Sequence, residues 1–186
     1  MGDSLVDRLR LKFPELSRQL EGRPHQAARE ALPFYRRHHL VTLTLQVRVP
    51  MVTRYLDDGV DFTLLDGSFG PVAAANARER LQLVPQHAEA YARFALQHGL
   101  GARVVERPEQ IRWDPGAAPK QKEDAIRALR PVRLVISPEG GFEVTAVLLD
   151  RADLVEARYR LTLNGRLEPL EARKLAERIP MERMPV

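Results

Sequence analysis

The residues best suited to acid–base chemistry fall on one predicted helix. His87, Tyr91 and His98 lie in a segment whose alanines and aromatic residues form one broad arc, with glutamines and charged residues on the other. An imidazole, a phenol and a carboxylate are sufficient for proton transfer, and Asp61 or Glu143 is the carboxylate we consider. The eleven residues between the two histidines span roughly 16 Å along a helix, too far for one metal ion. The pattern is compatible with a small-ligand pocket between this helix and a sheet.

Metal and phosphate chemistry have weaker support. Asp57, Asp58, Asp61 and Asp66 are hard oxygen ligands close together, but their spacing does not match an EF-hand loop, and Asp is an ordinary turn residue. The segment 67–71 (GSFGP) could begin a helix that binds an anion, yet it lacks the Lys–Ser/Thr ending of a P-loop. The chain has no cysteine, which excludes disulfides and thiolate metal sites. We therefore expect no metal and no cofactor.

An arginine-rich run beside an aromatic residue offers a different chemistry. Tyr35, Arg36 and Arg37 precede two histidines, and Arg48 follows nearby. Such a group could contact phosphates and stack a base. The same group describes the rim of a protein interface around an aromatic anchor. Both interpretations stay open, since no named nucleic-acid motif appears.

A second set of residues indicates contact with a protein. Arg133, Arg158 and Arg160, together with Arg48, occupy the polar face of predicted strands, where they could form the polar side of an interface. Trp113 is the only tryptophan and lies in a proline-rich loop, either as a plug of the core or as an anchor for a partner. We include these residues in the predicted interaction surface.

Composition and charge limit the class of protein. The 186 residues are 44% hydrophobic and 29% charged, which is typical of one folded domain. The net charge of +4 is small for a nucleic-acid module, and its sign changes from positive in the first fifty residues to negative in the next fifty. No apolar run is long enough to span a bilayer, and the first residues alternate charges with leucines instead of forming a signal peptide. We expect a cytoplasmic protein without membrane contact.

The first half of the chain predicts helices followed by strands. Residues 1–37 form an N-terminal helical segment, with helices over 3–21 and 25–32. Strict alternation of apolar and polar residues over 40–49 indicates a strand covered on one face. Two more strands and two helices follow, at 52–56, 60–65, 71–81 and 85–98.

The second half predicts an antiparallel meander. Residues 107–121 form a surface loop, and Asn164–Gly165 is the strongest hairpin signal in the chain. A final helix is expected over 172–179 from i, i+3, i+4, i+7 spacing. The remaining elements are a short strand at 103–105, a helix at 122–129 and strands at 132–137, 142–150 and 154–163.

Together these elements predict a single α+β domain over 1–186. Its antiparallel sheet has about six strands, with helices packed on one face. We expect a non-enzymatic interaction or assembly protein that self-associates or docks on a larger complex. The alternatives are a small-ligand-binding protein or enzyme, and a weak nucleic-acid binder acting through the arginine-rich N-terminal third.

Overall fold

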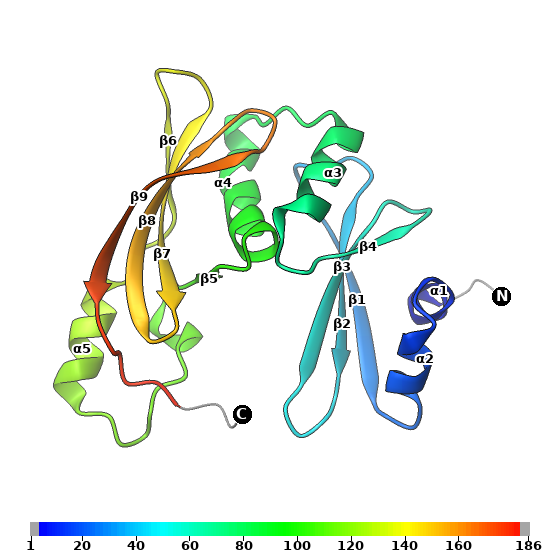
Figure 1. Ribbon diagram of the computed structural model, residues 1–186, viewed down its shortest axis with the longest axis horizontal. Coiled ribbons are helices and arrows are strands. Elements are labelled where there is room, and N and C mark those ends of the chain that lie inside the picture. The colour runs from blue at the N-terminus through cyan, green and yellow to red at the C-terminus, as the bar shows by residue number, and fades with distance from the viewer. Residues whose placement is uncertain (1–3, 183–186) are drawn as a thin grey trace.

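The chain is an α+β protein with two antiparallel sheets, shown by a computed structural model that describes residues 4–182 (Figure 1). The α-helices are α1 (Leu5–Lys12), α2 (Glu15–Leu20), α3 (Phe69–Glu79), α4 (Pro85–Phe94) and α5 (Pro119–Ala128). A π-helical turn η1 (Ala95–Gly99) extends α4, and a 3-10 turn η2 (Pro108–Gln110) precedes α5. The strands are β1 (His25–Ala31), β2 (His39–Leu45), β3 (Met51–Asp57), β4 (Phe62–Leu64), β5 (Arg103–Val104), β6 (Arg133–Ile136), β7 (Phe142–Asp150), β8 (Asp153–Leu161) and β9 (Leu167–Ala176).

The N-terminal sheet joins β1 to β4 in chain order. Alternation on β2 buries Val41, Leu43 and Leu45 against α1 and α2, as a period of two requires. Ser4 begins α1 with a capping box, in which its side chain and that of Asp7 each accept a bond from the other's backbone N–H. One face of this sheet is therefore covered by the first two helices.

The C-terminal sheet has the order β5-β7-β8-β9. Strand β6 pairs with the same edge of β7 as β5 does, but at the opposite end of that strand. Phe142, Val144 and Ala146 of β7 point to the core that includes α4. Val147 and Leu149 point to the opposite face, where α5 packs. Both faces of this sheet thus bear a helix.

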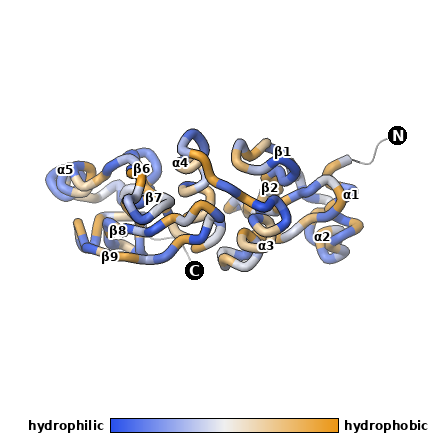
Figure 2. Tube along the Cα trace, turned by 90° about the horizontal axis from the view of Figure 1, so that it is seen from above, coloured by the Kyte–Doolittle hydropathy of each residue, from blue (hydrophilic) through white to orange (hydrophobic). Residues whose placement is uncertain are grey.

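Helices α3 and α4 lie between the two sheets and share a core with both (Figures 1 and 2). Leu56 of β3 and Val144 of β7 are both fully buried in this central core. Tyr91 of α4 is its largest fully buried side chain. The arrangement makes the molecule elongated, with a helical layer joining two sheets.

The prediction of one sheet of about six strands is therefore wrong, although the α+β class is confirmed. Strands close in sequence pair with one another, and the helices at 69–99 separate the two groups in space. The prediction that helices pack on only one face of the sheet is also wrong, because α4 and α5 cover opposite faces of the C-terminal sheet. Periodicity identified the strands but carries no information about which groups of strands join.

The predicted helical segment over 1–37 ends at Leu20, and residues 25–31 form a strand instead of a helix. The segment HQAAREA is rich in good helix formers, yet seven residues pair in continuous register with β2, from His25 opposite Leu45 to Ala31 opposite His39. Ladder pairing has overridden intrinsic propensity here.

The predicted final helix over 172–179 is also wrong, since β9 runs to Ala176. Two register shifts interrupt its pairing with β8, between Leu154 and Val155 and between Arg158 and Tyr159. The shift at Leu175 places Leu175 and Ala176 next to each other as half-buried residues, whereas Ala172 is exposed and Ile179 lies beyond the strand, so the apolar spacing does not mark one buried helical face.

Most other predicted elements are confirmed to within a few residues. Strand β7 spans 142–150 as predicted, and α5 covers most of 122–129. The proline-rich segment 107–121 is largely irregular, although η2 and the first turn of α5 lie within it. Trp113 is half-buried there, and its indole N–H donates to the Pro108 carbonyl at 3.0 Å.

Candidate functional site

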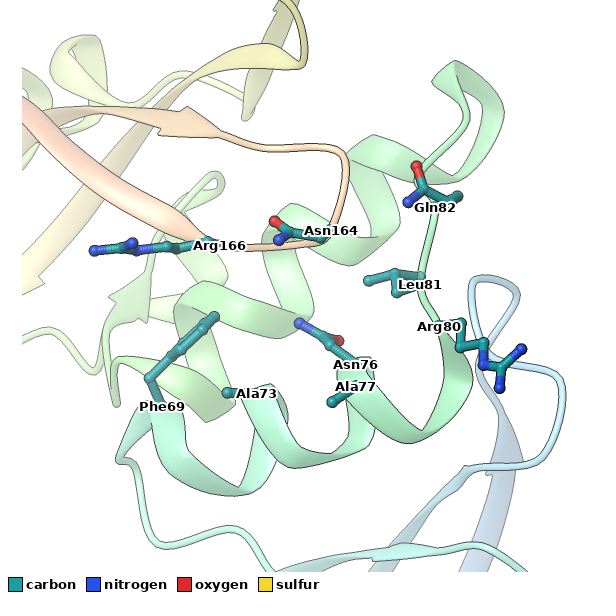
Figure 3. A pocket seen from close by; sticks show the side chains of 9 residues that line it. All are labelled: Phe69, Ala73, Asn76, Ala77, Arg80, Leu81, Gln82, Asn164 and Arg166. Atoms are coloured by element: carbon teal, nitrogen blue, oxygen red, sulfur yellow. The ribbon is translucent and has the colours of Figure 1, made fainter.

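An open groove of about 490 Å³ lies between α3 and the turn that joins β8 to β9 (Figure 3). Its floor is largely apolar and its ends carry amide and guanidinium groups. The lining residues are Phe69, Ala73, Asn76, Ala77, Arg80, Leu81, Gln82, Asn164 and Arg166.

One face of α3 forms the floor of the groove. Phe69, Ala73 and Ala77 follow one another at intervals of four residues, so they share a face of the helix. The Phe69 ring lies against Gly99 of η1, where an added Cβ would be 2.7 Å from the ring. Glycine at position 99 therefore lets the ring pack in this place, and the two exposed alanines leave the groove open above the helix.

Helix α3 ends at a strained residue beside the groove. Arg80 adopts the left-handed conformation with φ of 49°, where glycine is usual. The N–H of Leu81 donates to the Asn76 carbonyl at 2.9 Å, which turns the chain back and aims Leu81 into the groove. The Arg80 side chain extends from the end of the groove towards the N-terminal sheet (Figure 3).

The opposite wall is the β8–β9 turn, held against the helices by Gly165. This glycine has φ of +85°, and a Cβ there would meet the Tyr91 hydroxyl at 2.5 Å and the Asn76 side-chain nitrogen at 2.7 Å. The turn can approach this closely because residue 165 has no side chain. Asn164 and Arg166 on either side are thereby fixed over α3.

A buried chain of hydrogen bonds supports both walls. Tyr35 donates to the Asn76 Oδ1 atom, Asn76 donates from Nδ2 to the Tyr91 hydroxyl, and Tyr91 donates to the Gly165 carbonyl, each at 2.6 Å. Burial raises the pKa of Tyr91 to about 12, despite the opposing effect of Asn76, and burial raises the pKa of Tyr35 as well. Both phenols are neutral donors at physiological pH, so the chain is a structural support.

A second buried cluster fixes the arginine-rich loop at the end of α3. Glu79 accepts the backbone N–H groups of Arg36, Arg37 and His38 at 3.2, 2.8 and 3.0 Å, and the His38 ring nitrogen at 2.7 Å. Burial alone would raise the pKa of Glu79, but these hydrogen bonds outweigh it, and the pKa is lowered. Since the backbone is held inward, the Arg36 and Arg37 side chains remain exposed.

The residues predicted for acid–base chemistry do not meet in one pocket. Tyr91 is fully buried with its hydroxyl already bonded twice. Glu143 lies on the outer face of β7 and pairs with Arg158, and Asp61 pairs with Lys12 beside the N-terminal sheet. His87 and His98 lie at opposite ends of the α4–η1 helix, both partly exposed.

The acidic residues near the β3–β4 turn hold the backbone in place. Asp57 is fully buried and pairs with Arg8 and Arg29 at 3.1 and 3.0 Å, while Asp58 accepts the N–H groups of Val60 and Asp61. Among residues 4–182, no group of three His, Asp or Glu side chains could hold a metal ion.

The residues predicted for protein contact occupy separate surfaces. Arg158 pairs with Glu143 and Glu171 at 3.0 Å, and Arg160 pairs with Glu139, all on the outer face of the C-terminal sheet. Exposed Arg48 lies in the β2–β3 turn, far from the groove along the N-terminal sheet.

Three predicted interaction residues do belong to the surroundings of the groove. Arg36 and Arg37 are held beside the end of α3 by Glu79, and buried Tyr35 supports the groove through Asn76. Asn76, Arg80 and Arg166 were not singled out by sequence. The Asn164–Gly165 signal marked one wall, but no local pattern shows which helix that turn meets.

Comparison of the chain with family models, curated proteins and solved structures gives no match. No helix between residues 4 and 182 is long and apolar enough to cross a membrane. The groove must therefore be interpreted from its own chemistry.

Proposed function

We propose that this chain is a non-enzymatic interaction protein that binds an acidic, partly apolar segment of a partner protein in the groove beside α3. The observation that carries the proposal is the composition of the lining. It combines an apolar floor with two arginines and three amide side chains, and it contains no acidic residue.

The apolar part supports a peptide ligand over a small polar metabolite. Phe69, Ala73 and Ala77 form a strip along α3 that continues into Leu81. Such a strip suits the apolar side chains of a helix or an extended segment, which would exclude water as they bind.

The charges at the ends of the groove support an acidic ligand. Within residues 4–182, the exposed side chains of Arg36, Arg37 and Arg80 form no ion pair. Arg166 has one exposed partner, Glu168 at 3.3 Å. Guanidinium groups without strong internal partners are available for bidentate contact with carboxylates.

The proton-transfer alternative has less support, because the interior beside Tyr91 is filled by residues such as Ala88, Ala92 and Leu96, all fully buried. The nucleic-acid alternative shares the same arginines, but phosphates would not use the apolar strip. Binding of a nucleic acid is therefore one outcome of the test below.

A random peptide library displayed on phage, selected on the wild-type chain, tests the proposal. We expect enriched peptides to combine acidic and apolar residues. Synthetic versions should bind A77W at least tenfold more weakly, because the indole would fill the groove, and R80E should weaken binding about tenfold.

A matched variant, A74W, separates filling of the groove from general effects on α3. Ala74 is also exposed on α3 but does not line the groove. The proposal is wrong if no peptide is enriched, or if A74W and A77W bind equally well. Tight binding of a single-stranded oligonucleotide that R36E and R37E abolish would instead support the nucleic-acid function.

A further inference from the structure

Strand β6 is an open edge of the C-terminal sheet. It pairs with β7 on one side only, and its Val135 and Ile136 are 65% and 67% exposed. Large aliphatic side chains on an unpaired edge favour addition of another strand.

The other long edges carry features that discourage strand addition. Strand β9 contains Pro169, two register shifts and charged residues such as Glu171 and Arg173. Strand β1 carries Arg29 and Glu30, whereas β4 and β5 are only three and two residues long. Strand β6 has four residues and begins with Arg133, but Leu134 to Ile136 carries no charge, no proline and no register shift.

The hydrogen-bond pattern shows which backbone groups of β6 are directed outward. Ser137 donates its N–H to the Gly141 carbonyl at 3.0 Å, so the odd-numbered residues of β6 bond towards β7. Val132 confirms this alternation, because its N–H points away from β7 and donates to Glu106 at 2.8 Å. The N–H and C=O groups of Leu134 and Ile136 therefore point away from β7.

We propose that a second copy of this chain pairs with β6 in antiparallel fashion, with a twofold axis at Val135. In this register Leu134 of each copy lies opposite Ile136 of the other, and each such pair exchanges two backbone hydrogen bonds. The two Val135 side chains then face each other as a non-hydrogen-bonded pair, in which side chains approach most closely. The two C-terminal sheets become one continuous sheet.

Self-complementary charge favours a second copy over an unrelated strand. The same register places Arg133 opposite Ser137 of the other copy, next to the turn that carries Glu139, an exposed carboxylate that pairs with Arg160 in its own chain and has oxygen lone pairs for a second guanidinium. Arg133 is exposed and forms no ion pair within the described residues. The twofold axis repeats this contact, so each copy supplies both the cation and the anion.

Light scattering during size-exclusion chromatography, at loading concentrations up to about 1 mM, tests the pairing. We expect the wild-type chain to dimerise as concentration rises. V135K should remain monomeric, because it places two ammonium groups together at the axis. A mixture of V135K with V135E should regain dimers, since opposite charges then meet there.

L170K is the matched control, because Leu170 is a half-exposed aliphatic residue on the protected edge β9. It should dimerise as the wild type does. Amide exchange at Leu134 and Ile136 should be slowed at least tenfold at high concentration in the wild type and not in V135K. The proposal is overturned by a wild-type monomer at every concentration, by a V135K dimer, or by a V135K and V135E mixture that stays monomeric. The groove beside α3 is not involved, so these outcomes are independent of its function.

Discussion

The Tyr91 hydroxyl donates a 2.6 Å hydrogen bond to the Gly165 carbonyl, and this contact joins α4 to the turn that forms one wall of the groove. The same hydroxyl accepts from Asn76 on α3. One oxygen atom therefore fixes three segments that are far apart in the sequence.

Removing this oxygen should destabilise the protein without changing its core volume much. Y91F leaves the Gly165 carbonyl and one Asn76 N–H buried without this partner, and we expect a loss of about 1 to 3 kcal/mol in the free energy of unfolding. Urea denaturation followed by circular dichroism measures it. Y159F is the control, because that half-buried tyrosine makes no such bond, and it should change stability by no more than about 0.5 kcal/mol. Equal effects of the two variants would contradict this role of Tyr91.

Two glycines with the same backbone conformation should differ in how much stability is lost when each is replaced by alanine. Gly165 and Gly140 have φ of +85° and +90°, but a Cβ at Gly140 meets nothing within 4 Å, whereas at Gly165 it would overlap Tyr91 and Asn76. Both variants place a Cβ-bearing residue in the left-handed conformation, which costs about 1 to 2 kcal/mol in the folded state. We expect G165A to cost at least about 2 kcal/mol more than G140A, because the turn must also move away from the helices. Thermal unfolding of both variants measures the difference, and similar melting temperatures would show that the close approach is unimportant.

The sequence predicted those parts of the fold that depend on local patterns. Alternation identified β2, β7 and β8, and the Asn164–Gly165 pair identified the hairpin after β8. Local patterns failed at β1 and β9, where residues that favour helices pair with β2 and β8. Pairing between segments is a tertiary property, and residue propensities at those two positions oppose it.

The candidate site was less accessible to prediction than the fold. Tyr91 was interpreted as a reactive group because it lies on an amphipathic helix, yet the structure gives it two buried partners from distant segments. Glu79 gave no signal, although it fixes the Arg36–Arg37 loop through three backbone N–H groups. Contacts between a side chain and a distant backbone leave no local pattern in the sequence.

Arg80 should show opposite effects on stability and on binding. Its left-handed conformation at the end of α3 is one that glycine adopts at lower cost. R80G should therefore raise the free energy of unfolding by about 0.5 to 1 kcal/mol, because the strain is removed. The same variant should weaken binding of the acidic peptides selected on the groove, because it removes a cation. Urea denaturation and fluorescence anisotropy measure the two effects. A destabilised R80G would contradict the strain, and unchanged affinity would contradict the role of the charge.

His98 should make the protein less stable in mild acid. Burial, and secondarily the positive charge of Arg54, lower the pKa of His98 from 6.5 to about 4. The unfolded chain therefore binds more protons than the folded chain between these two values, and stability must decrease as pH falls through that range. Since part of the ring is in contact with water, we expect a loss of about 1 to 2 kcal/mol.

The contribution of His98 can be separated from that of the carboxyl groups. The lowered pKa of Glu79 gives stability that is present above its unfolded value of 4.5 and is lost only as pH falls below it. Between pH 6.5 and 5 the difference between wild type and H98Q therefore reports on His98. Urea denaturation over this range should show a smaller loss of stability in H98Q, and R54A should lie between the two because it removes the secondary cause. If H98Q and the wild type lose stability equally, the imidazole is not held neutral by its position in η1.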